Sequence, residues 1–154
     1  MIRPLHIIWQ RFLRPMLQRP SGLQVAALCR REGASGPEVL LVSSRGTGRW
    51  IIPKGWPIRG LGSAEAALQE AWEEAGVRRG DADTEPCGTY TYHKRLAGGL
   101  AIPVETLVFP VRVKEMSDSY PEVRQRKRVW VSPKSAAEMV GEPELKQILL
   151  KLQS

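Results

Sequence analysis

Three glutamates lie close together in one predicted helix, and their spacing restricts the fold more than any other feature of this chain. Glu70, Glu73 and Glu74 share one side of a helix because successive residues turn by about 100°. The opposite side is apolar and consists of Leu68, Ala71, Trp72 and Ala75. Clustered like charges destabilise a helix, so a hard divalent cation is the simplest partner for these carboxylates. An acidic face turned to solvent is the alternative interpretation.

Glycine and proline residues flank this helix and indicate its ends. Gly76 follows the helix at a point where a left-handed residue commonly closes it, and Ser63 is suited to cap its start. Upstream, residues 53–60 form a loop punctuated by Gly and Pro. Such a loop can bring backbone carbonyls and amides close to an ion or a phosphate. The sequence therefore predicts a helix over 63–75 beside a loop suited to ligand contact.

The stretch from Gly55 to Val77 resembles the Nudix box, in which Gly, five residues, Glu and seven residues precede Arg-Glu-aliphatic-any-Glu-Glu-any-Gly-aliphatic. The matching positions are Gly55, Glu70, Ala71, Glu73, Glu74, Gly76 and Val77. Two positions depart, because Leu61 stands at the early Glu and Gln69 at the Arg. In the family that Arg orients a box carboxylate through an ion pair. Gln69 can offer an amide hydrogen bond but carries no charge.

The resemblance extends beyond the box, over roughly residues 22–152. Residues 50–60 and 128–137 resemble the corresponding parts of diphosphoinositol-polyphosphate and diadenosine-polyphosphate phosphohydrolases. The resemblance implies an α+β fold, an α/β/α sandwich with a mixed β-sheet. Apolar and turn-forming patterns predict strands over 24–30, 38–43, 49–52, 88–94, 105–113 and 128–131, a polar connection over 78–86, and helical segments over 135–140 and 143–152.

The resemblance also implies a chemistry for the acidic helix. Glu70, Glu73 and Glu74 are the expected metal ligands and catalytic residues for Mg²⁺ or Mn²⁺, with a carbonyl of the box loop, at Lys54 or Gly55, completing the shell. Glu74 is the expected general base, and Glu122 is its rival. The expected reaction is hydrolysis of a phosphoanhydride bond in a nucleoside diphosphate derivative, dinucleoside polyphosphate or related polyphosphate.

Basic residues near the box are the candidate substrate contacts. Arg45 and Arg49 bracket a hairpin tip, and Lys54 and Arg59 lie in the box loop, where they can contact phosphate oxygens. Tyr92 is a candidate for stacking on a base, as a tyrosine near this position does in some dinucleoside-polyphosphate Nudix enzymes. Each of these bases alone is compatible with a solvated surface residue, and Tyr92 with a strand face. The basic runs 93–95 and 124–128 are further candidates, although such runs usually decorate exposed loops.

The net charge of +7 belongs mainly to the N-terminus. Residues 1–31 hold six arginines and no acid, which leaves 17 bases and 16 acids in the remainder. Residues 1–20 are predicted to form a basic amphipathic arm, and 21–154 a single Nudix domain. The arm is expected to pack on its own domain or on a second copy, and the alternative is contact with an anionic membrane. It lacks the small-residue cleavage site of a secretory signal.

Three functions remain open at this stage. The first is the metal-dependent hydrolase, with a small-molecule substrate. The second is a Nudix-fold nucleotide or polyphosphate-binding protein with weak or no turnover, as Leu61 and Gln69 suggest. The third is a basic RNA- or membrane-associated module, which the nearly neutral body disfavours, so no nucleic acid is expected. Cys29 and Cys87 are predicted to be buried thiols without a disulfide, which fits a reducing cytoplasm.

Overall fold

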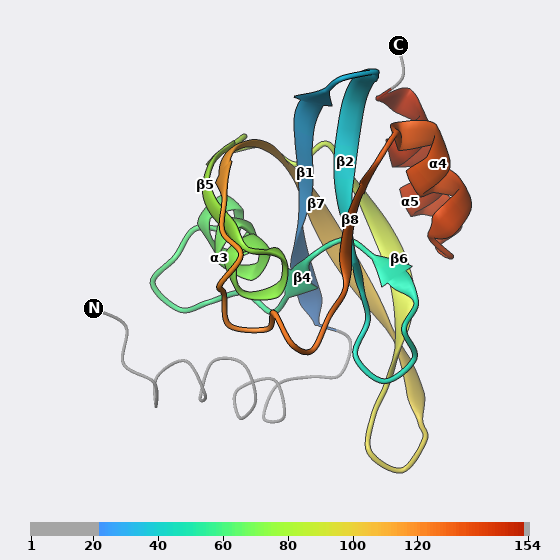
Figure 1. The fold of residues 1–154 in the computed structure, drawn as a ribbon. Coiled ribbons are helices and arrows are strands. Elements are labelled where there is room, and N and C mark those ends of the chain that lie inside the picture. The colour runs from blue at the N-terminus through green and yellow to red at the C-terminus, as the bar shows by residue number, and fades with distance from the viewer. Residues whose placement is uncertain (1–21, 153–154) are drawn as a thin grey trace.

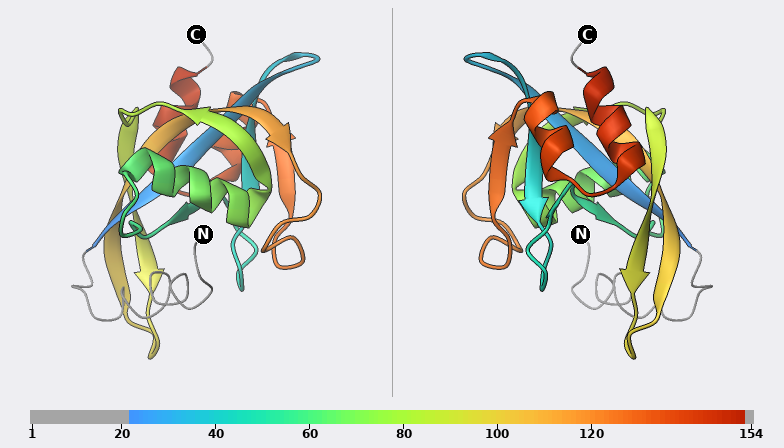
Figure 2. Two further views of the ribbon diagram at one scale, coloured as in Figure 1. Left: turned by 90° about the vertical axis from the view of Figure 1, so that its left-hand side faces the viewer. Right: turned by 90° about the vertical axis from the view of Figure 1, so that its right-hand side faces the viewer.

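The structure, a computed structural model, describes residues 22–152 and has three layers (Figure 1). A mixed sheet of eight strands separates one helix on one face from two helices on the other. Figure 2 shows these two faces in turn. The predicted α/β/α sandwich is therefore confirmed. The predicted arm at 1–20 lies outside the described residues, and within 22–152 the structure has no helix long and apolar enough to span a bilayer.

The described residues form strands and helices in the following order along the chain. The strands are β1 (Leu23–Gly33), β2 (Gly36–Ser43), β3 (Trp50–Ile51), β4 (Lys54–Gly55), β5 (Val77–Ala82), β6 (Gly88–Arg95), β7 (Ala101–Met116) and β8 (Arg128–Val131). The helices are α3 (Ser63–Ala75), α4 (Pro133–Met139) and α5 (Pro143–Lys151). Labels are those of Figure 1.

Strands β1 and β7 form the centre of the sheet. They run parallel to each other, with Leu23 opposite Glu105, and β2 and β4 pair antiparallel with β1. The long β7 also pairs antiparallel with β6 along 101–108 and with β5 along 111–116. Strands β3 and β8 both pair with β2. The pairing of β4 with β1 places the box loop directly beside the central strands.

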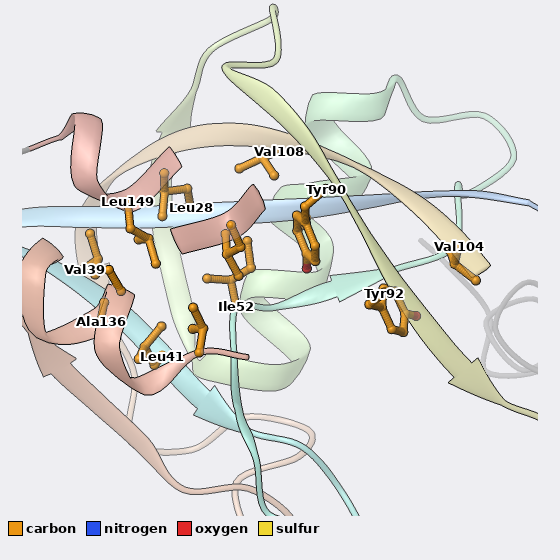
Figure 3. Close-up of a cluster of buried hydrophobic side chains, with 14 residues drawn as sticks. Leu28, Val39, Leu41, Ile52, Tyr90, Tyr92, Val104, Val108, Ala136 and Leu149 are labelled. Atoms are coloured by element: carbon orange, nitrogen blue, oxygen red, sulfur yellow. The ribbon is translucent and has the colours of Figure 1, made fainter. Parts of the chain in front are cut away.

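Strand β1 is buried on both faces, which explains why its sequence is an uninterrupted apolar run rather than an alternating one. Val25, Ala27 and Cys29 belong to the core between the sheet and α3. Ala26 and Leu28 belong to the core between the sheet and the pair α4–α5. The second of these cores also contains Tyr90 and Tyr92 of β6 (Figure 3).

The two C-terminal helices cover the second core. The hydroxyl of Ser132 caps α4 by accepting a hydrogen bond from the backbone N–H of Ser135 at 3.1 Å, and Pro133 occupies the first turn. In α5, Leu145 and Leu149 are fully buried. The predicted helical segments over 135–140 and 143–152 are confirmed with small shifts at their ends.

Three local predictions were wrong. Residues 78–86 were expected to form a polar connection, but Val77–Ala82 is a strand. This strand lies at the end of the sheet path and most of its polar residues are exposed, so its sequence lacks the apolar alternation that would have predicted a strand. The box loop contains the short strand β4. The N-cap of α3 is Gly62 rather than Ser63, without a side-chain cap. The predicted left-handed closure at Gly76 is confirmed, with φ 75°.

The packing of α5 predicts a contrast between two adjacent leucines. Leu149 is 0% exposed and Leu150 is 42% exposed. Leu149→Ala should lower the free energy of unfolding by about 2–5 kcal/mol because it leaves a cavity, whereas Leu150→Ala should change it by about 0.5 kcal/mol or less. Urea denaturation of both variants measures this. Equal losses would contradict the described docking of α5.

Candidate active site

The three carboxylates of α3 are buried rather than turned to solvent. Glu70 is 1% exposed, Glu73 7% and Glu74 2%, so the interpretation of a solvated acidic face was wrong. A buried carboxylate is costly unless it is paired or hydrogen-bonded. The contacts around each of these three acids therefore determine whether the helix can pack at all.

Glu73 is held by its own helix and by a distant loop. The amide Nε2 of Gln69 donates a hydrogen bond to Oε2 of Glu73 at 2.8 Å. The carbonyl oxygen of Glu73 accepts a hydrogen bond from the N–H of Glu122 at 2.9 Å. The uncharged contact expected of Gln69 is therefore present, and the loop before β8 is fastened to the acidic turn of α3.

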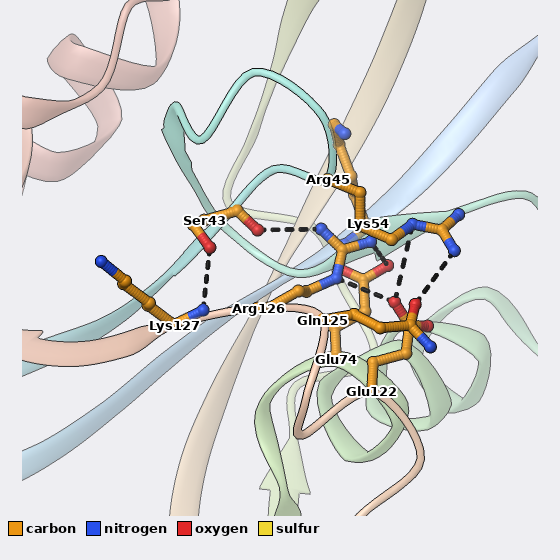
Figure 4. Close-up of polar contacts among 8 residues, drawn as sticks. All are labelled: Ser43, Arg45, Lys54, Glu74, Glu122, Gln125, Arg126 and Lys127. Carbon is orange, nitrogen blue, oxygen red and sulfur yellow. Dashed lines mark hydrogen bonds and ion pairs between the residues drawn. The ribbon is translucent and has the colours of Figure 1, made fainter.

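Glu74 forms an ion pair with Arg126, which comes from that same loop. Nη2 of Arg126 lies 3.4 Å from Oε2 of Glu74, and Nε of Arg126 donates to Oε1 of Glu122 at 2.9 Å. The N–H of Lys54 lies 3.4 Å from Oε1 of Glu74. Figure 4 shows the guanidinium between the two carboxylates. The basic run 124–128 was expected to decorate an exposed loop, but the side chain of Arg126 is only 7% exposed.

Gly55 allows the closest approach between the box loop and α3. A Cβ at this position would stand 2.5 Å from Oε1 and 2.6 Å from Oε2 of Glu70, which is closer than real contacts allow. A side chain at position 55 would therefore force the carboxylate of Glu70 to move, which favours Gly there. This contact gives a physical reason for the Gly that begins the box.

Lys54 lies between the carboxylates and the aromatic side chains of β6. Its ammonium nitrogen is 4.4 Å from the ring centroid of Tyr92, within the range of a cation–π contact. Burial lowers the pKa of Lys54 to about 8, and the charge of Glu74 opposes that shift. Tyr92 is 7% exposed, and its hydroxyl donates to Oε1 of Gln24. Lys54 thus covers one face of Tyr92, whose expected role in base stacking stays a prediction.

A cleft of about 760 Å³ lies beside this cluster. The loop 44–49, the end of β6 and the turn 141–144 form its walls. It contains the candidates Arg45, Arg49 and Tyr92 together with Lys94. Arg59 is exposed and does not line this cleft.

Acidic residues at the cleft were missed by the sequence analysis. Oε2 of Glu142 lies 3.2 Å from Nη1 of Arg49, and Oε1 of Glu144 accepts a hydrogen bond from the N–H of Thr91 at 2.9 Å. Neither acid belongs to a recognisable sequence motif. Their positions at the cleft follow from the way the α4–α5 turn packs on β6. Arg49 therefore has an acidic partner in the turn 141–144 of the same cleft.

The carboxylate oxygens of α3 are chemically suited to bind a hard divalent cation. Glu70 and Glu74 lie close to the backbone of the box loop, and Glu73 is buried on the same helix. Oxygen ligands are those that Mg²⁺ and Mn²⁺ prefer. As they stand, however, no three acidic, His or Cys side chains within 22–152 have the spacing of a metal site. Arg126 lies 3.4 Å from Oε2 of Glu74, and Gln69 donates to Glu73, so these two carboxylates already have partners.

Comparison with known proteins agrees with this geometry. Residues 21–152 match the NUDIX domain family. This chain belongs to the Nudix family. Nudix hydrolase 21, chloroplastic, from Arabidopsis thaliana is 32% identical over 126 residues, which are 78% of this chain and 59% of that protein. Nudix hydrolase 17, mitochondrial, from the same plant is 31% identical over 112 residues, which are 73% of this chain and 59% of that protein. The Nudix chain thus spans little more than half the length of these relatives.

Solved structures share the Nudix fold at lower identity. An Ap4A hydrolase binary complex from C. elegans has a TM-score of 0.62 at 19% identity and covers 85% of this chain and 94% of its own. The NUDIX domain of Shewanella oneidensis NrtR, complexed with ADP ribose, has a TM-score of 0.62 at 16% identity and covers 99% of both chains. At these identities the likeness shows a shared fold.

The contact between Gly55 and Glu70 predicts the effect of one added methyl group. Gly55→Ala should lower the free energy of unfolding by about 1–3 kcal/mol because the core is overpacked. Gly141→Ala is the matched control, since its nearest atom would be 3.9 Å from the new Cβ; its change should be about 0.5 kcal/mol or less. Urea denaturation compares them, and an unchanged Gly55→Ala would contradict the close contact.

The lowered pKa of Lys54 predicts a pH dependence of stability. The unfolded chain keeps the Lys54 proton up to about its ordinary pKa of 10.5, whereas the folded chain loses it near pH 8. The folded state therefore gains stability relative to the unfolded state as pH rises from 8 to 10.5. The unfolding free energy of the wild type minus that of Lys54→Met should increase over this window. A constant or falling difference in urea titrations would contradict the burial of the ammonium group.

Proposed function

We propose that this Nudix protein hydrolyses a phosphoanhydride bond in a nucleoside diphosphate derivative, dinucleoside polyphosphate or related polyphosphate, and that it requires Mg²⁺ or Mn²⁺. The observation that carries the proposal is the position of Lys54. Its backbone N–H contacts Glu74, and its ammonium group lies over Tyr92, which lines the basic cleft. Cations suited to phosphate are therefore adjacent to carboxylates suited to a metal.

The metal ligands would come from the helix and the box loop. Glu70, Glu73 and Glu74 would hold the ion, with the carbonyl of Gly55 as a further oxygen ligand. When bound, the ion neutralises phosphate oxygens and lowers the pKa of a coordinated water. Family membership supports the use of a divalent ion, and the choice between Mg²⁺ and Mn²⁺ is part of the proposal.

The cleft would orient the phosphate chain. Arg45 contacts the side-chain oxygen of Gln125 at 3.2 Å, and Arg49 pairs with Glu142, so both guanidinium groups are held near the opening. Arginine binds phosphate oxygens through two parallel N–H donors, whereas Lys94 acts as a point charge. These three cations would bind the phosphates that are not being cleaved.

Two further candidate contacts differ in their surroundings. Lys54 is next to Glu74 and would contact the phosphate that is attacked. Arg59 is exposed in the box loop, outside the cleft, and would contact only a substrate that extends beyond it. Fixing the substrate in this way makes the attack effectively intramolecular.

Proton transfer would involve one of two carboxylates. Glu74 accepts a proton from the attacking water, the water oxygen bonds to phosphorus, and the bond to the bridging oxygen breaks. Two phosphorylated fragments are released. Glu122 is the alternative base, because Arg126 joins it to Glu74. General-base catalysis of this kind contributes about 10²–10⁴-fold.

The second candidate function is ligand binding with weak or no turnover. The ion pair between Arg126 and Glu74 favours it, because the guanidinium already neutralises a carboxylate that a metal requires. Leu61 also stands where the family box has its early Glu, and Gln69 stands where the box has its Arg. Under this function, a nucleotide would raise the melting temperature without releasing products.

Cytoplasmic location is also part of the proposal. Cys29 and Cys87 are both free thiols, although only Cys29 is buried as expected. Free thiols support a reducing compartment.

Glu74→Gln tests the hydrolase directly. With Mg²⁺ or Mn²⁺ and a panel that includes ADP-ribose and diadenosine polyphosphates, it should lower kcat by about 100-fold or more, because it removes a metal ligand and base. Glu65→Gln, on the exposed first turn of α3, is the control and should stay within about twofold of wild type. Product release is followed by chromatography, and melting curves establish that both variants are folded.

Full turnover by folded Glu74→Gln would reject the assigned role of this carboxylate. Ligand-induced stabilisation of the wild type without products from any member of the panel would support the binding function instead. Metal-independent hydrolysis would reject the proposed cofactor.

A further inference from the structure

The guanidinium of Arg126 lies where carboxylates from two separate segments meet. Nη2 is 3.4 Å from Glu74 on α3, and Nε donates to Glu122 of the loop before β8 at 2.9 Å. Nη1 donates to the carbonyl oxygen of Ser43 at 3.1 Å. All three nitrogens of the group are thus engaged, and the side chain is almost fully buried (Figure 4).

This arrangement places one cation against two acids. Arginine stays protonated at all ordinary pH values, so Arg126 cannot relieve the competition by losing its charge. A divalent ion carries twice its charge in a smaller volume and prefers carboxylate oxygens. Arg126 already lies beside Glu74, so a divalent ion that bound this carboxylate would compete with the guanidinium for its charge.

We infer that Arg126 is an internal cation that occupies the carboxylate site and exchanges with a divalent metal ion. The inference rests on the proposed function only in that a divalent ion is the cofactor. Metal binding then moves Glu74 away from Arg126 and changes the contacts that fix the loop 117–127 to α3. Arg126 acts on the metal by competition and thereby sets the concentration at which the site is loaded.

Metal affinity without any substrate tests the competition. Mn²⁺ binding is measured by electron paramagnetic resonance for the wild type, Arg126→Gln and Arg124→Gln. Arg126→Gln should bind Mn²⁺ at least about tenfold more tightly because the competing charge is gone. Arg124 is exposed in the same loop, so Arg124→Gln removes one charge at a solvated position and should stay within about twofold. Unchanged or weaker binding by folded Arg126→Gln would overturn the inference.

A second measurement uses the wild type and does not depend on the folding of Arg126→Gln. Arginine Nε–H signals are recorded by nuclear magnetic resonance during a titration with diamagnetic Mg²⁺. The Arg126 signal is assigned by its absence in Arg126→Lys, which keeps the charge. It should shift in step with Mg²⁺ saturation, because the hydrogen-bonded network of the guanidinium rearranges. A signal that does not move at saturation would overturn the inference.

These readouts separate the inference from the proposed function. Tighter Mn²⁺ binding by Arg126→Gln together with a wild type that releases no product supports the inference and rejects the hydrolase. Mg²⁺-dependent hydrolysis by a wild type whose Arg126 signal is static supports the hydrolase and rejects the inference.

Discussion

Burial of three carboxylates on one helix is the interaction on which the rest of this structure depends. Helix α3 covers one face of the sheet through its alanines, and the same docking removes Glu70, Glu73 and Glu74 from water. Isolated buried charges are unstable, and two side chains supply hydrogen-bond donors or charge to them. Gln69 comes from α3 itself, and Arg126 comes from the loop before β8. The box loop approaches so closely that a Cβ at position 55 would displace the carboxylate of Glu70. Site and fold are therefore stabilised by the same contacts.

The charge of the molecule has to be understood locally. The overall excess of +7 is concentrated before residue 32, yet the described domain still gathers several cations at one cleft. Acidic side chains form ion pairs with two of these cations. Glu142 pairs with Arg49, and Oε1 of Glu122 lies 4.0 Å from Nε of Arg45. Under the proposed function, a substrate phosphate would enter a site where guanidinium groups are already oriented, which reduces the ordering required on binding.

Much of the fold was predictable because the patterns that specify it are local. The strand at β1 is a continuous apolar run, and the helix over 63–75 and the closing helices have apolar residues at helical spacing. The glutamates of α3 are identified by their spacing together with the flanking residues that resemble the Nudix box. Strand β5 escaped prediction because its sequence is polar and it lies at the end of the sheet path. The roles of Arg126 and Glu142 escaped because each acquires its partner only through tertiary packing. The basic run 124–128 has no feature in the sequence that distinguishes the buried Arg126 from the exposed Arg124.

The sheet topology has a consequence for the order of events during folding. The parallel pairing of β1 with β7 joins segments as far apart as Leu23 and Glu105, and Arg128 reaches the carbonyl oxygen of Ala75 across 53 positions. Non-local pairing of this kind is slow because chain entropy is lost before contacts form. Until the central strands meet, the glutamates of α3 stay hydrated and repel one another. The buried carboxylate cluster of α3 is therefore a late product of folding, assembled only after the polypeptide has closed its longest loops.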